Sequence, residues 1–303
     1  MKDEMRSIHL LQFGASGQLA RELIRALAKD SGIGSTVLSR AQADFSKPQE
    51  IAEAVLAAPK VDVVVNAVAY TAVDRAESEK ELAACVNAEA VGRLAKACRD
   101  RKIPLIHVST DYVFDGTKSA PYVESDATNP LSVYGRTKLA GEALIRDSLN
   151  EHVILRTSWV YSAHGSNFVK TMLRLGAERE ELRIVDDQWG APTSATDLAR
   201  AIVKIVRNLA VSEDDGRFGT FHFSDAGGTT WRRFAEEIFR QAPWSGVSAQ
   251  VVPIGSADYP TPARRPANSR LDTTKIGRVY GVAPPPWQTS LTSVLADLKE
   301  SWA

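Results

Sequence analysis

The sequence predicts an α/β protein built on a doubly wound parallel sheet, with a smaller lobe formed by its C-terminal part. Over the first 160 residues, short apolar runs alternate with segments of helical periodicity. The apolar runs show no polar alternation, which is typical of strands that helices cover on both faces. After about residue 160 this rhythm ends, and segments rich in Pro, Gly and Asn separate the remaining helices.

The expected elements follow one another in a regular order. The sheet region should contain strand 8–13, helix 17–29, strand 36–39, helix 48–57, strand 61–67, helix 78–101, strand 104–109, helix 131–147 and strand 152–158. Further helices are expected near 196–210, 230–241 and 288–300. We therefore expect one domain of residues 1–160. Residues 161–303 should mainly form a lobe over the carboxyl edge of the sheet, with some segments returning to the core.

The composition argues against several classes of function. Lys and Arg together number 37 among 303 residues, as do Asp and Glu, and like charges form no long run. A nucleic-acid partner or a membrane-surface role therefore gets no support. The chain does not begin with the pattern of a signal peptide, and no apolar stretch reaches the ~20 residues of a membrane span. We therefore expect a cytoplasmic protein.

A glycine-rich turn follows the first expected strand. In GASGQLARELI, Gly14, Gly17 and Ala20 occupy the positions of a G-x-x-G-x-x-[GA] motif that opens a helix. Glycines allow the backbone to approach a pyrophosphate closely, and the N–H groups at the helix N-terminus can bind it. Ordinary strand-to-helix turns also use glycine, but the strand–turn–helix context favours dinucleotide binding and a Rossmann-type sheet.

The end of the second strand bears on which dinucleotide is bound. Ser39 and Arg40 stand where an NAD-preferring site usually places a carboxylate against the ribose 2′-hydroxyl. A guanidinium can hold a 2′-phosphate, and no acid stands beside it at the strand end, which favours NADPH over NADH. The alternative is that Arg40 is simply exposed in a turn. Asp44 and Phe45 are expected to flank the adenine by a hydrogen bond and a ring contact, and the segment after the third strand should line the ribose and nicotinamide through Ala67, Ala69, Tyr70 and Thr71.

A tyrosine and a lysine stand four positions apart in SVYGRTKLAGE. On a helix, Tyr134 and Lys138 would share one face, so the lysine charge is expected to lower the pKa of the phenol and ease proton transfer. The spacing also fits an ordinary helix face. Thr110 and Asp111 end the fourth strand, at the edge where open α/β sheets bind ligands. Thr110, Tyr134 and Lys138 together form a set that can grip and protonate a ketone while a nicotinamide gives hydride.

These features resemble the extended short-chain dehydrogenase/reductases. More narrowly, the chain is similar nearly end to end to the dTDP-4-dehydrorhamnose reductase family, through the blocks VVNAVAYTAVDRAE, VSTDYVFDG, SVYGRTKLAGE, RTSWVY, NFVKTMLRL, DDQWGAPT and RRPANSRLD. The resemblance implies NADPH-dependent reduction of the 4-keto group of dTDP-4-dehydro-L-rhamnose to dTDP-L-rhamnose, a precursor of surface polysaccharides. It therefore implies a dTDP-sugar as the substrate partner.

The resemblance also implies roles for individual residues. Tyr134 would be the proton donor, Lys138 its partner that also holds the nicotinamide ribose, and Thr110 the residue beside the keto oxygen. The cofactor turn would include Ser16, Gly17, Gln18 and Leu19, and the implied substrate contacts are Thr110, Asp111, Tyr134, Trp159, Asn167 and an arginine, Arg264 or preferably Arg265, on the diphosphate. Each has an ordinary alternative, since a tryptophan is often core and an exposed arginine is often solvated.

A bound metal, the oligomeric state and the use of NADH stay open. Some relatives bind Mg²⁺ through glutamates, and Glu22 matches the first of these positions. Thr196 stands where a second glutamate is expected, with Asp197 one step out of register, so Mg²⁺ is doubtful. A homodimer is equally open.

Three other functions compete with the reductase. A related dehydratase would follow Thr110–Asp111 with Glu, where this chain has Tyr112. A 4-epimerase keeps tightly bound NAD, which the Ser39–Arg40 strand end disfavours. A non-catalytic regulatory subunit like the β subunit of methionine adenosyltransferase shares the fold and several blocks.

Overall fold

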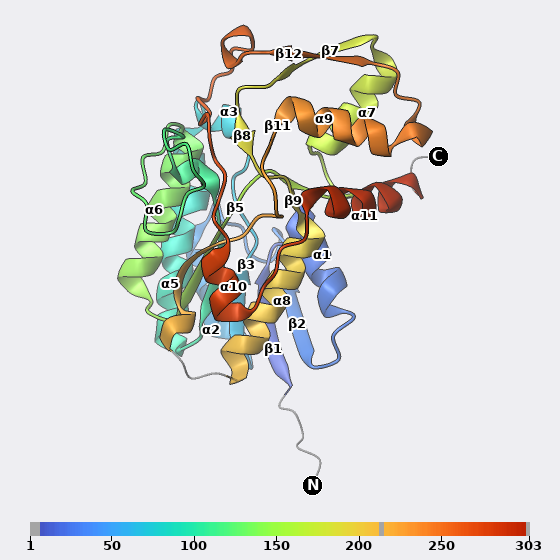
Figure 1. The fold of residues 1–303 in the computed structure, drawn as a ribbon. Coiled ribbons are helices and arrows are strands. Elements are labelled where there is room, and N and C mark those ends of the chain that lie inside the picture. The colour runs from blue at the N-terminus through green and yellow to red at the C-terminus, as the bar shows by residue number, and fades with distance from the viewer. Residues whose placement is uncertain (1–6, 212–214, 301–303) are drawn as a thin grey trace.

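The computed structural model describes residues 7–211 and 215–300 and is centred on a parallel sheet of six strands (Figure 1). The strands lie in the order β2-β1-β3-β4-β5-β10, and each neighbouring pair is parallel. Their bounds are β1 Ile8–Phe13, β2 Ile33–Leu38, β3 Val63–Asn66, β4 Leu105–Thr110, β5 His152–Thr157 and β10 Gly219–His222. The strand order reverses between β1 and β3, which opens a crevice at the carboxyl ends of these strands.

Helices cover both faces of the sheet. One face carries α1 (Gln18–Leu27), α8 (Ala195–Val211) and α10 (Thr274–Tyr280), and the other carries α2 (Pro48–Ala57), α5 (Ala90–Arg101) and α6 (Val133–Ser148). Within β3, Val63 and Val65 belong to one apolar cluster and Val64 to the other. Both faces of the strand therefore need apolar side chains, which confirms the doubly wound α/β fold expected from strands without polar alternation.

The segment expected to form one helix over 78–101 is helical from Lys80 to Arg101 and contains one irregularity. It consists of α4 (Lys80–Ala84), a π-helical turn η1 (Cys85–Glu89) and α5, and a separate short helix, α3 (Val73–Ala76), precedes it. The side chain of Asn87, inside the π-helical turn, reaches the backbone of Tyr70. Because π turns insert an extra residue into the helical ladder, this irregularity directs the polar side chain toward the loop after β3.

A third apolar cluster lies beyond the carboxyl edge of the sheet (Figure 1). It joins α7 (Phe168–Glu178), α9 (Trp231–Gln241) and α11 (Trp287–Lys299) to the parallel strands β7 (Glu181–Val185) and β12 (Gln250–Ile254). Short strands pair nearby, β6 (Val160–Tyr161) with β9 (Thr193–Ser194) and β8 (Trp189–Gly190) with β11 (Thr229–Thr230). The 3₁₀ turns are η2 Asp111–Val113, η3 Asp215–Arg217, η4 Pro243–Ser245 and η5 Ser256–Asp258. Since β10, α8 and α10 pack on the sheet, residues after 160 contribute to both layers, and a domain boundary at residue 160 stays a prediction.

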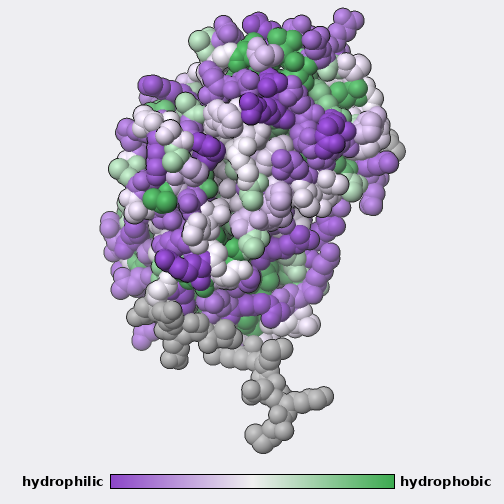
Figure 2. Space-filling model, in the orientation of Figure 1, coloured by the Kyte–Doolittle hydropathy of each residue, from purple (hydrophilic) through white to green (hydrophobic). Residues whose placement is uncertain are grey.

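The molecular surface is mixed in character. Among the coloured residues of the face in Figure 2, hydrophilic residues predominate and hydrophobic ones form only small groups. Within the described ranges, every helix is too short or too polar to cross a membrane.

Candidate functional site

A cleft of about 450 Å³ lies between the carboxyl edge of the sheet and the lobe. It is the crevice expected where the strand order reverses. Of the residues singled out from the sequence, those that line it are Gly17, Gln18, Leu19, Ala67, Ala69, Thr71, Thr110, Asp111, Tyr134, Lys138 and Trp159. Residues far apart in the chain therefore meet in one place.

The glycine-rich turn forms one end of the cleft. Gly14 has φ +100°, a conformation that favours glycine, and its N–H donates to Leu38 O at 2.9 Å. Gly17 precedes α1 and has no atom within 4 Å of the position a Cβ would take, so a ligand can approach its backbone. The buried Gln12, which the sequence did not single out, donates to Gly14 O at 2.8 Å and Ala20 O at 3.1 Å. Ser16 is exposed beside this turn and does not line the cleft.

The residues expected around the adenosine end of the cofactor lie outside this cleft. Ser39 donates from its hydroxyl to Gln42 Oε1 at 2.8 Å. The Arg40 side chain is 81% exposed, and its Nε lies 3.3 Å from Asp44 Oδ2. The expectation that no acid stands near Arg40 was therefore wrong, because the turn after β2 folds Asp44 back onto it.

Phe45 belongs to the core of the sheet domain. Its ring is 3% exposed and packs edge-to-face on Phe13, with ring centroids 5.7 Å apart. Because the apolar ring packs into the core of the sheet domain, little of its surface remains for an adenine. Contact of Phe45 with the cofactor stays a prediction.

The loop after β3 is held from outside the cleft. Tyr70 N–H donates to Asn87 Oδ1 at 2.8 Å, and Asn87 Nδ2 reaches Tyr70 O at 3.2 Å and Thr137 Oγ1 at 3.1 Å. The Tyr70 hydroxyl donates to Glu79 Oε2 at 2.6 Å, so this side chain is turned away from the lining of the cleft. Asn87 thus ties the loop to α6, which carries Tyr134 and Lys138.

Thr110, Tyr134 and Lys138 meet at the centre of the cleft. Thr110 ends β4, and its hydroxyl donates to Asp111 Oδ1 at 3.0 Å. Helix α6 begins after Ser132, whose hydroxyl accepts from Gly135 N–H at 3.1 Å. The geometry brings the three side chains together, and their catalytic roles stay a prediction.

Burial decides the protonation of this group. It raises the pKa of Tyr134 to about 12, although a hydrogen bond with Thr110 acts in the opposite direction. Burial also lowers the pKa of Lys138 to about 8, opposed by the charge of Glu142. The expected lowering of the tyrosine pKa by Lys138 was therefore wrong. Lys138 Nζ is instead held by His107 Nε2 at 3.0 Å and Val108 O at 2.7 Å. A protonated phenol at neutral pH suits a proton donor.

An aromatic wall closes one side of the cleft. Trp159 has φ +45°, unusual for a bulky residue, and its ring stacks on Trp231 with centroids 3.5 Å apart. A Cβ on Gly190 would lie 2.4 Å from the Trp159 ring, so only glycine leaves room for it there. Trp231 was missed because its position at the start of an amphipathic helix carries no sequence signal of a ligand. Beside this wall, burial raises the pKa of Asp111 to about 7.

Two residues expected to contact substrate do not line the cleft. Asn167 caps α7, and its Nδ2 donates to Gln18 Oε1 at 2.9 Å and Ser162 O at 2.7 Å. Arg265 pairs with Asp74 through its Nη2 at 2.8 Å from Asp74 Oδ2, whereas Arg264 is exposed. Asn167 therefore reaches the cleft only through Gln18, and contact of Arg265 with a ligand stays a prediction.

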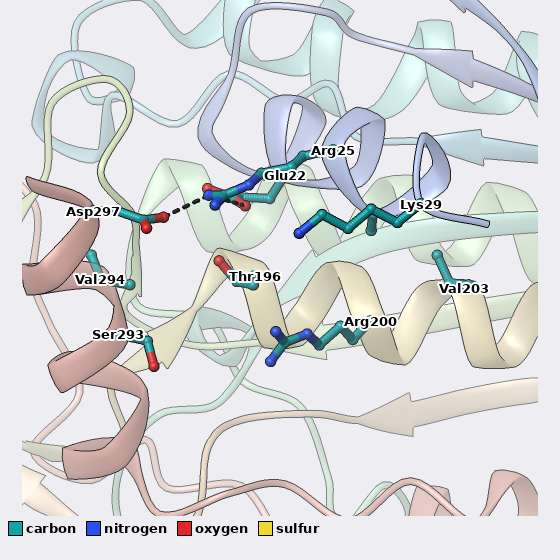
Figure 3. A pocket seen from close by; sticks show the side chains of 10 residues that line it. Glu22, Arg25, Lys29, Thr196, Arg200, Val203, Ser293, Val294 and Asp297 are labelled. Atoms are coloured by element: carbon teal, nitrogen blue, oxygen red, sulfur yellow. Dashed lines mark hydrogen bonds and ion pairs between the residues drawn. The ribbon is translucent and has the colours of Figure 1, made fainter. Parts of the chain in front are cut away.

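Glu22 lies in a separate pocket of about 360 Å³ between α1, α8 and α11 (Figure 3). Arg25 takes the position between its carboxylates, because Arg25 Nη1 lies 2.5 Å from Asp297 Oδ2 and 3.9 Å from Glu22 Oε2. The pocket also holds Lys29 and Arg200. No three His, Cys, Asp or Glu side chains gather to hold a metal ion within residues 7–211 and 215–300. A donor set that already contains three cationic side chains does not fit Mg²⁺.

The chain is similar to known proteins over nearly its whole length. Residues 8–300 match the family model described as RmlD substrate binding domain. The chain is 43% identical over 299 residues to the dTDP-4-dehydrorhamnose reductase of Escherichia coli K12, covering 96% of this chain and 98% of the relative.

Two solved structures are similar over nearly their whole length. The dTDP-4-dehydrorhamnose reductase of Clostridium acetobutylicum superposes with a TM-score of 0.89 at 36% identity, covering 96% of this chain and 100% of the other. The enzyme of the same name from Bacillus anthracis, in complex with NADP, gives 0.87 at 32% identity, covering 96% and 99%. The chain therefore belongs to the family with the RmlD substrate binding domain, as the seven sequence blocks indicated.

Proposed function

We propose that this protein reduces the 4-keto group of dTDP-4-dehydro-L-rhamnose with NADPH and so forms dTDP-L-rhamnose. One observation carries the proposal. Thr110, Tyr134 and Lys138 line the same cleft as the glycine-rich turn, in a chain 43% identical to a dTDP-4-dehydrorhamnose reductase. The bound NADP of the Bacillus anthracis relative supports NADPH as the reductant.

The cleft supplies groups for holding the dinucleotide. Helix α1 starts at Gln18 without a side-chain cap, so its first N–H groups and the open backbone at Gly17 can receive a diphosphate. Arg40 would reach the 2′-phosphate by exchanging its bond to Asp44, and Lys138 would hold the nicotinamide ribose. NADPH supplies the hydride that the protein itself lacks.

Tyr134 supplies the proton of the reduction. Hydride arriving at C4 of the sugar turns the carbonyl oxygen into an alkoxide, and the Tyr134 hydroxyl gives its proton to that oxygen, leaving a phenolate. Protonated Lys138 would stabilise the phenolate, and Thr110 would orient the oxygen. Trp159 and Trp231 present flat apolar surfaces for the sugar ring and exclude water from the reacting carbon.

The competing functions have less support. The relatives compared above are reductases by name, and the comparisons do not favour a non-catalytic regulatory subunit. A subunit of that kind would bind NADPH without consuming it, so turnover separates the two functions.

The test is the reaction itself. Pure protein with NADPH and the 3,5-epimerised dTDP-4-keto sugar should lose absorbance of NADPH, with a dTDP-6-deoxy sugar as product identified by mass and NMR. The keto sugar before epimerisation serves as the comparison substrate, because it differs from the epimerised sugar only in configuration at C3 and C5. NADPH binding without consumption of either sugar would overturn the proposal.

We propose further that turnover needs no divalent cation, because Arg25 stands between Glu22 and Asp297. Millimolar EDTA should leave most of the activity, measured by NADPH consumption before and after adding Mg²⁺. Activity lost with EDTA and regained with Mg²⁺ would contradict this. A homodimer and a cytoplasmic location stay predictions, the first open to light scattering on the pure protein.

A further inference from the structure

A buried chain of three polar side chains joins β3, β4 and α6 beneath the cleft. Asn66, His107 and Lys138 are each no more than 1% exposed. Asn66 Nδ2 lies 3.0 Å from His107 Nδ1, and His107 Nε2 lies 3.0 Å from Lys138 Nζ. At one end of the chain Val68 N–H donates to Asn66 Oδ1 at 2.9 Å, and at the other Lys138 Nζ donates to Val108 O at 2.7 Å.

The position of each proton follows from the end at Asn66. The Val68 N–H can only donate, so the Asn66 atom it meets is the oxygen and the other amide atom is a donor. His107 Nδ1 must then accept a hydrogen bond. In a neutral imidazole this leaves the proton on Nε2, which faces Lys138 Nζ.

This arrangement distinguishes the two protonation states of the lysine. A neutral Lys138 amine accepts from His107 Nε2–H with its lone pair and still donates to Val108 O. An ammonium has no lone pair, so two donors would face each other across 3.0 Å. Protonation of Lys138 therefore breaks one hydrogen bond of a buried chain, at a free-energy cost.

We propose that His107 is a positioning residue for Lys138: oriented by Asn66, its Nε2–H group opposes protonation of the lysine and so limits the pH range in which Lys138 serves the reaction. Because that reaction is the one proposed above, the inference rests on the proposed function. His107 itself does not line the cleft and acts through Lys138, which does.

The nearby carboxylates do not cancel this effect. Glu142 lies one turn beyond Lys138 on α6, but it accepts from Arg156 at 2.9 and 2.7 Å and from Ser109 at 2.6 Å. Its charge is thus largely compensated before it reaches the lysine. Asp111 follows β4, and burial raises its pKa to about 7, which removes part of its charge near neutral pH.

Burial acts in the same direction as the hydrogen-bond chain. It lowers the pKa of Lys138 to about 8 and lowers that of His107, with the lysine charge as the second cause for His107. Tyr134, the other titrating group on this face of α6, keeps its proton in the same range because burial raises its pKa. An alkaline fall in activity at a pH of about 8 is therefore assigned to Lys138.

The first test reads the tautomer directly and needs no substrate. In ¹⁵N-histidine-labelled protein, ¹⁵N–¹H correlation spectra above the pKa of Lys138 should show His107 protonated at Nε2 and bare at Nδ1. The His107→Gln variant identifies the signal by its loss. In Asn66→Asp, the carboxylate still accepts from Val68 N–H but also accepts from Nδ1–H, so the proton should move to Nδ1.

The second test follows the pH dependence of kcat/KM and of NADPH binding. In Asn66→Asp, His107 Nε2 becomes an acceptor for the ammonium. The apparent pKa of the alkaline fall in activity should therefore rise by about one pH unit or more. His107→Gln should also raise it, because its amide can present oxygen to Lys138. The matched control is His222→Gln, because His222 is also a fully buried histidine, on β10. This variant should leave the apparent pKa of the alkaline fall unchanged.

The outcomes separate a positioning role from a structural one. Suppose the variants lose thermal stability, but kcat/KM and NADPH binding still fall at the same alkaline pH as in the wild type. That result would overturn the proposal, as would a wild-type His107 protonated at Nδ1. If Asn66→Asp does not fold, the wild-type spectrum and His107→Gln still decide. If no keto sugar is reduced, the spectra and the NADPH binding profile test His107 while the proposed function fails separately.

Discussion

At the scale of single residues, burial sets the chemistry of the cleft more than the charge of neighbours does. Tyr134 keeps its proton because desolvation raises its pKa to about 12, and Lys138 loses its proton easily because desolvation lowers its pKa to about 8. A tyrosine that holds its proton until an alkoxide forms beside it is a suitable general acid. The proposed reduction therefore depends on the phenol hydroxyl and not on a preformed phenolate.

Tyr134→Phe should lower kcat by about 10²-fold or more, because it removes the proton source while keeping the ring. NADPH affinity, measured by fluorescence titration, should change little, since Lys138 and the glycine-rich turn remain. Tyr112→Phe is the matched control, because this ring packs edge-to-face on Tyr134 with centroids 5.9 Å apart. Near-normal turnover of Tyr134→Phe would refute the assigned role.

Arg40→Ala should reduce the preference for NADPH over NADH, chiefly by raising the KM for NADPH about tenfold, since one charge-assisted bond to the 2′-phosphate is lost. Its pairing with Asp44 limits the effect, because NADPH must first displace that bond. Lys47→Ala is the control: it removes an exposed cation from the same segment that pairs with Glu50 at 2.8 Å. Equal KM changes for the two cofactors would show that Arg40 does not read the phosphate.

Residues whose place follows from the local sequence pattern could be predicted, and residues whose role depends on tertiary contacts were missed. Thr110 and Tyr134 could be placed because strand ends and an i,i+4 helical spacing fix their positions. Phe45 could not, because whether a ring after a strand meets ligand or core depends on Phe13 from another strand. His107 was missed because a histidine inside an apolar strand gives no sign of its partners on β3 and α6.

At the scale of elements, the placement of α6 controls the site. The helix was predicted nearly to its ends, because Ser132 is a good N-cap and the apolar spacing is helical. Its close approach to neighbouring backbone was not predicted. A Cβ on Gly135 would lie 2.2 Å from Tyr112 O, and one on Gly141 would lie 2.1 Å from Asn87 O.

Gly135→Ala should shift α6 away from Tyr112 and destabilise the fold by about 1–3 kcal/mol, the usual cost of overpacking. Because Tyr134 and Lys138 move with the helix, kcat should fall more than KM for the sugar changes. Ala140→Ser, on the exposed side of the same helix, is the matched control. Denaturant unfolding and steady-state kinetics measure both effects, and unchanged kinetics in a destabilised variant would separate helix packing from catalysis.

The π-helical turn η1 inside the expected helix 78–101 could not be predicted from the sequence. The apolar spacing of this segment is helical throughout, and nothing local signals a π turn. The turn is stabilised only by tertiary contacts, because Asn87 forms hydrogen bonds with the backbone of Tyr70 and with the Thr137 hydroxyl. A long-range requirement therefore overrode a locally consistent helix.

At the scale of the whole molecule, the sheet and the helices of the C-terminal part were predictable, and the pairing of distant strands was not. Continuous apolar strands and intervening helices give a doubly wound sheet almost by themselves. The return of β10 to the edge of the sheet beside β5, and the pairing of β7 with β12, depend on partners that lie 66 and 69 residues away in register. Such pairings leave no periodic trace in the sequence.

One buried carboxyl connects the sheet to the lobe and makes stability depend on pH. Asp225 follows β10, is 1% exposed, and its Oδ2 accepts from Ser194 N–H of β9 at 2.9 Å. Burial raises its pKa to about 7, and the charge of Asp197 acts in the same direction. Since the folded pKa lies above the ordinary value, the stability contributed by the protonated acid is complete below a pH of about 4 and is lost as pH rises through about 7.

Asp225→Asn should therefore gain thermal stability relative to the wild type as pH rises from about 5 to about 8, because the amide mimics the neutral acid and never ionises. Asp115→Asn provides a control of opposite sign. Hydrogen bonds from Thr117 lower the pKa of Asp115 to about 2, so its contribution is present at neutral pH and is lost only as pH falls toward that value. This control should be less stable than wild type by a nearly constant amount over the same range. The measurement is the melting temperature of the three proteins across this pH range. A difference between Asp225→Asn and wild type that does not change with pH would mean that Asp225 stays ionised. The sheet and the lobe would then be joined there by a charged group.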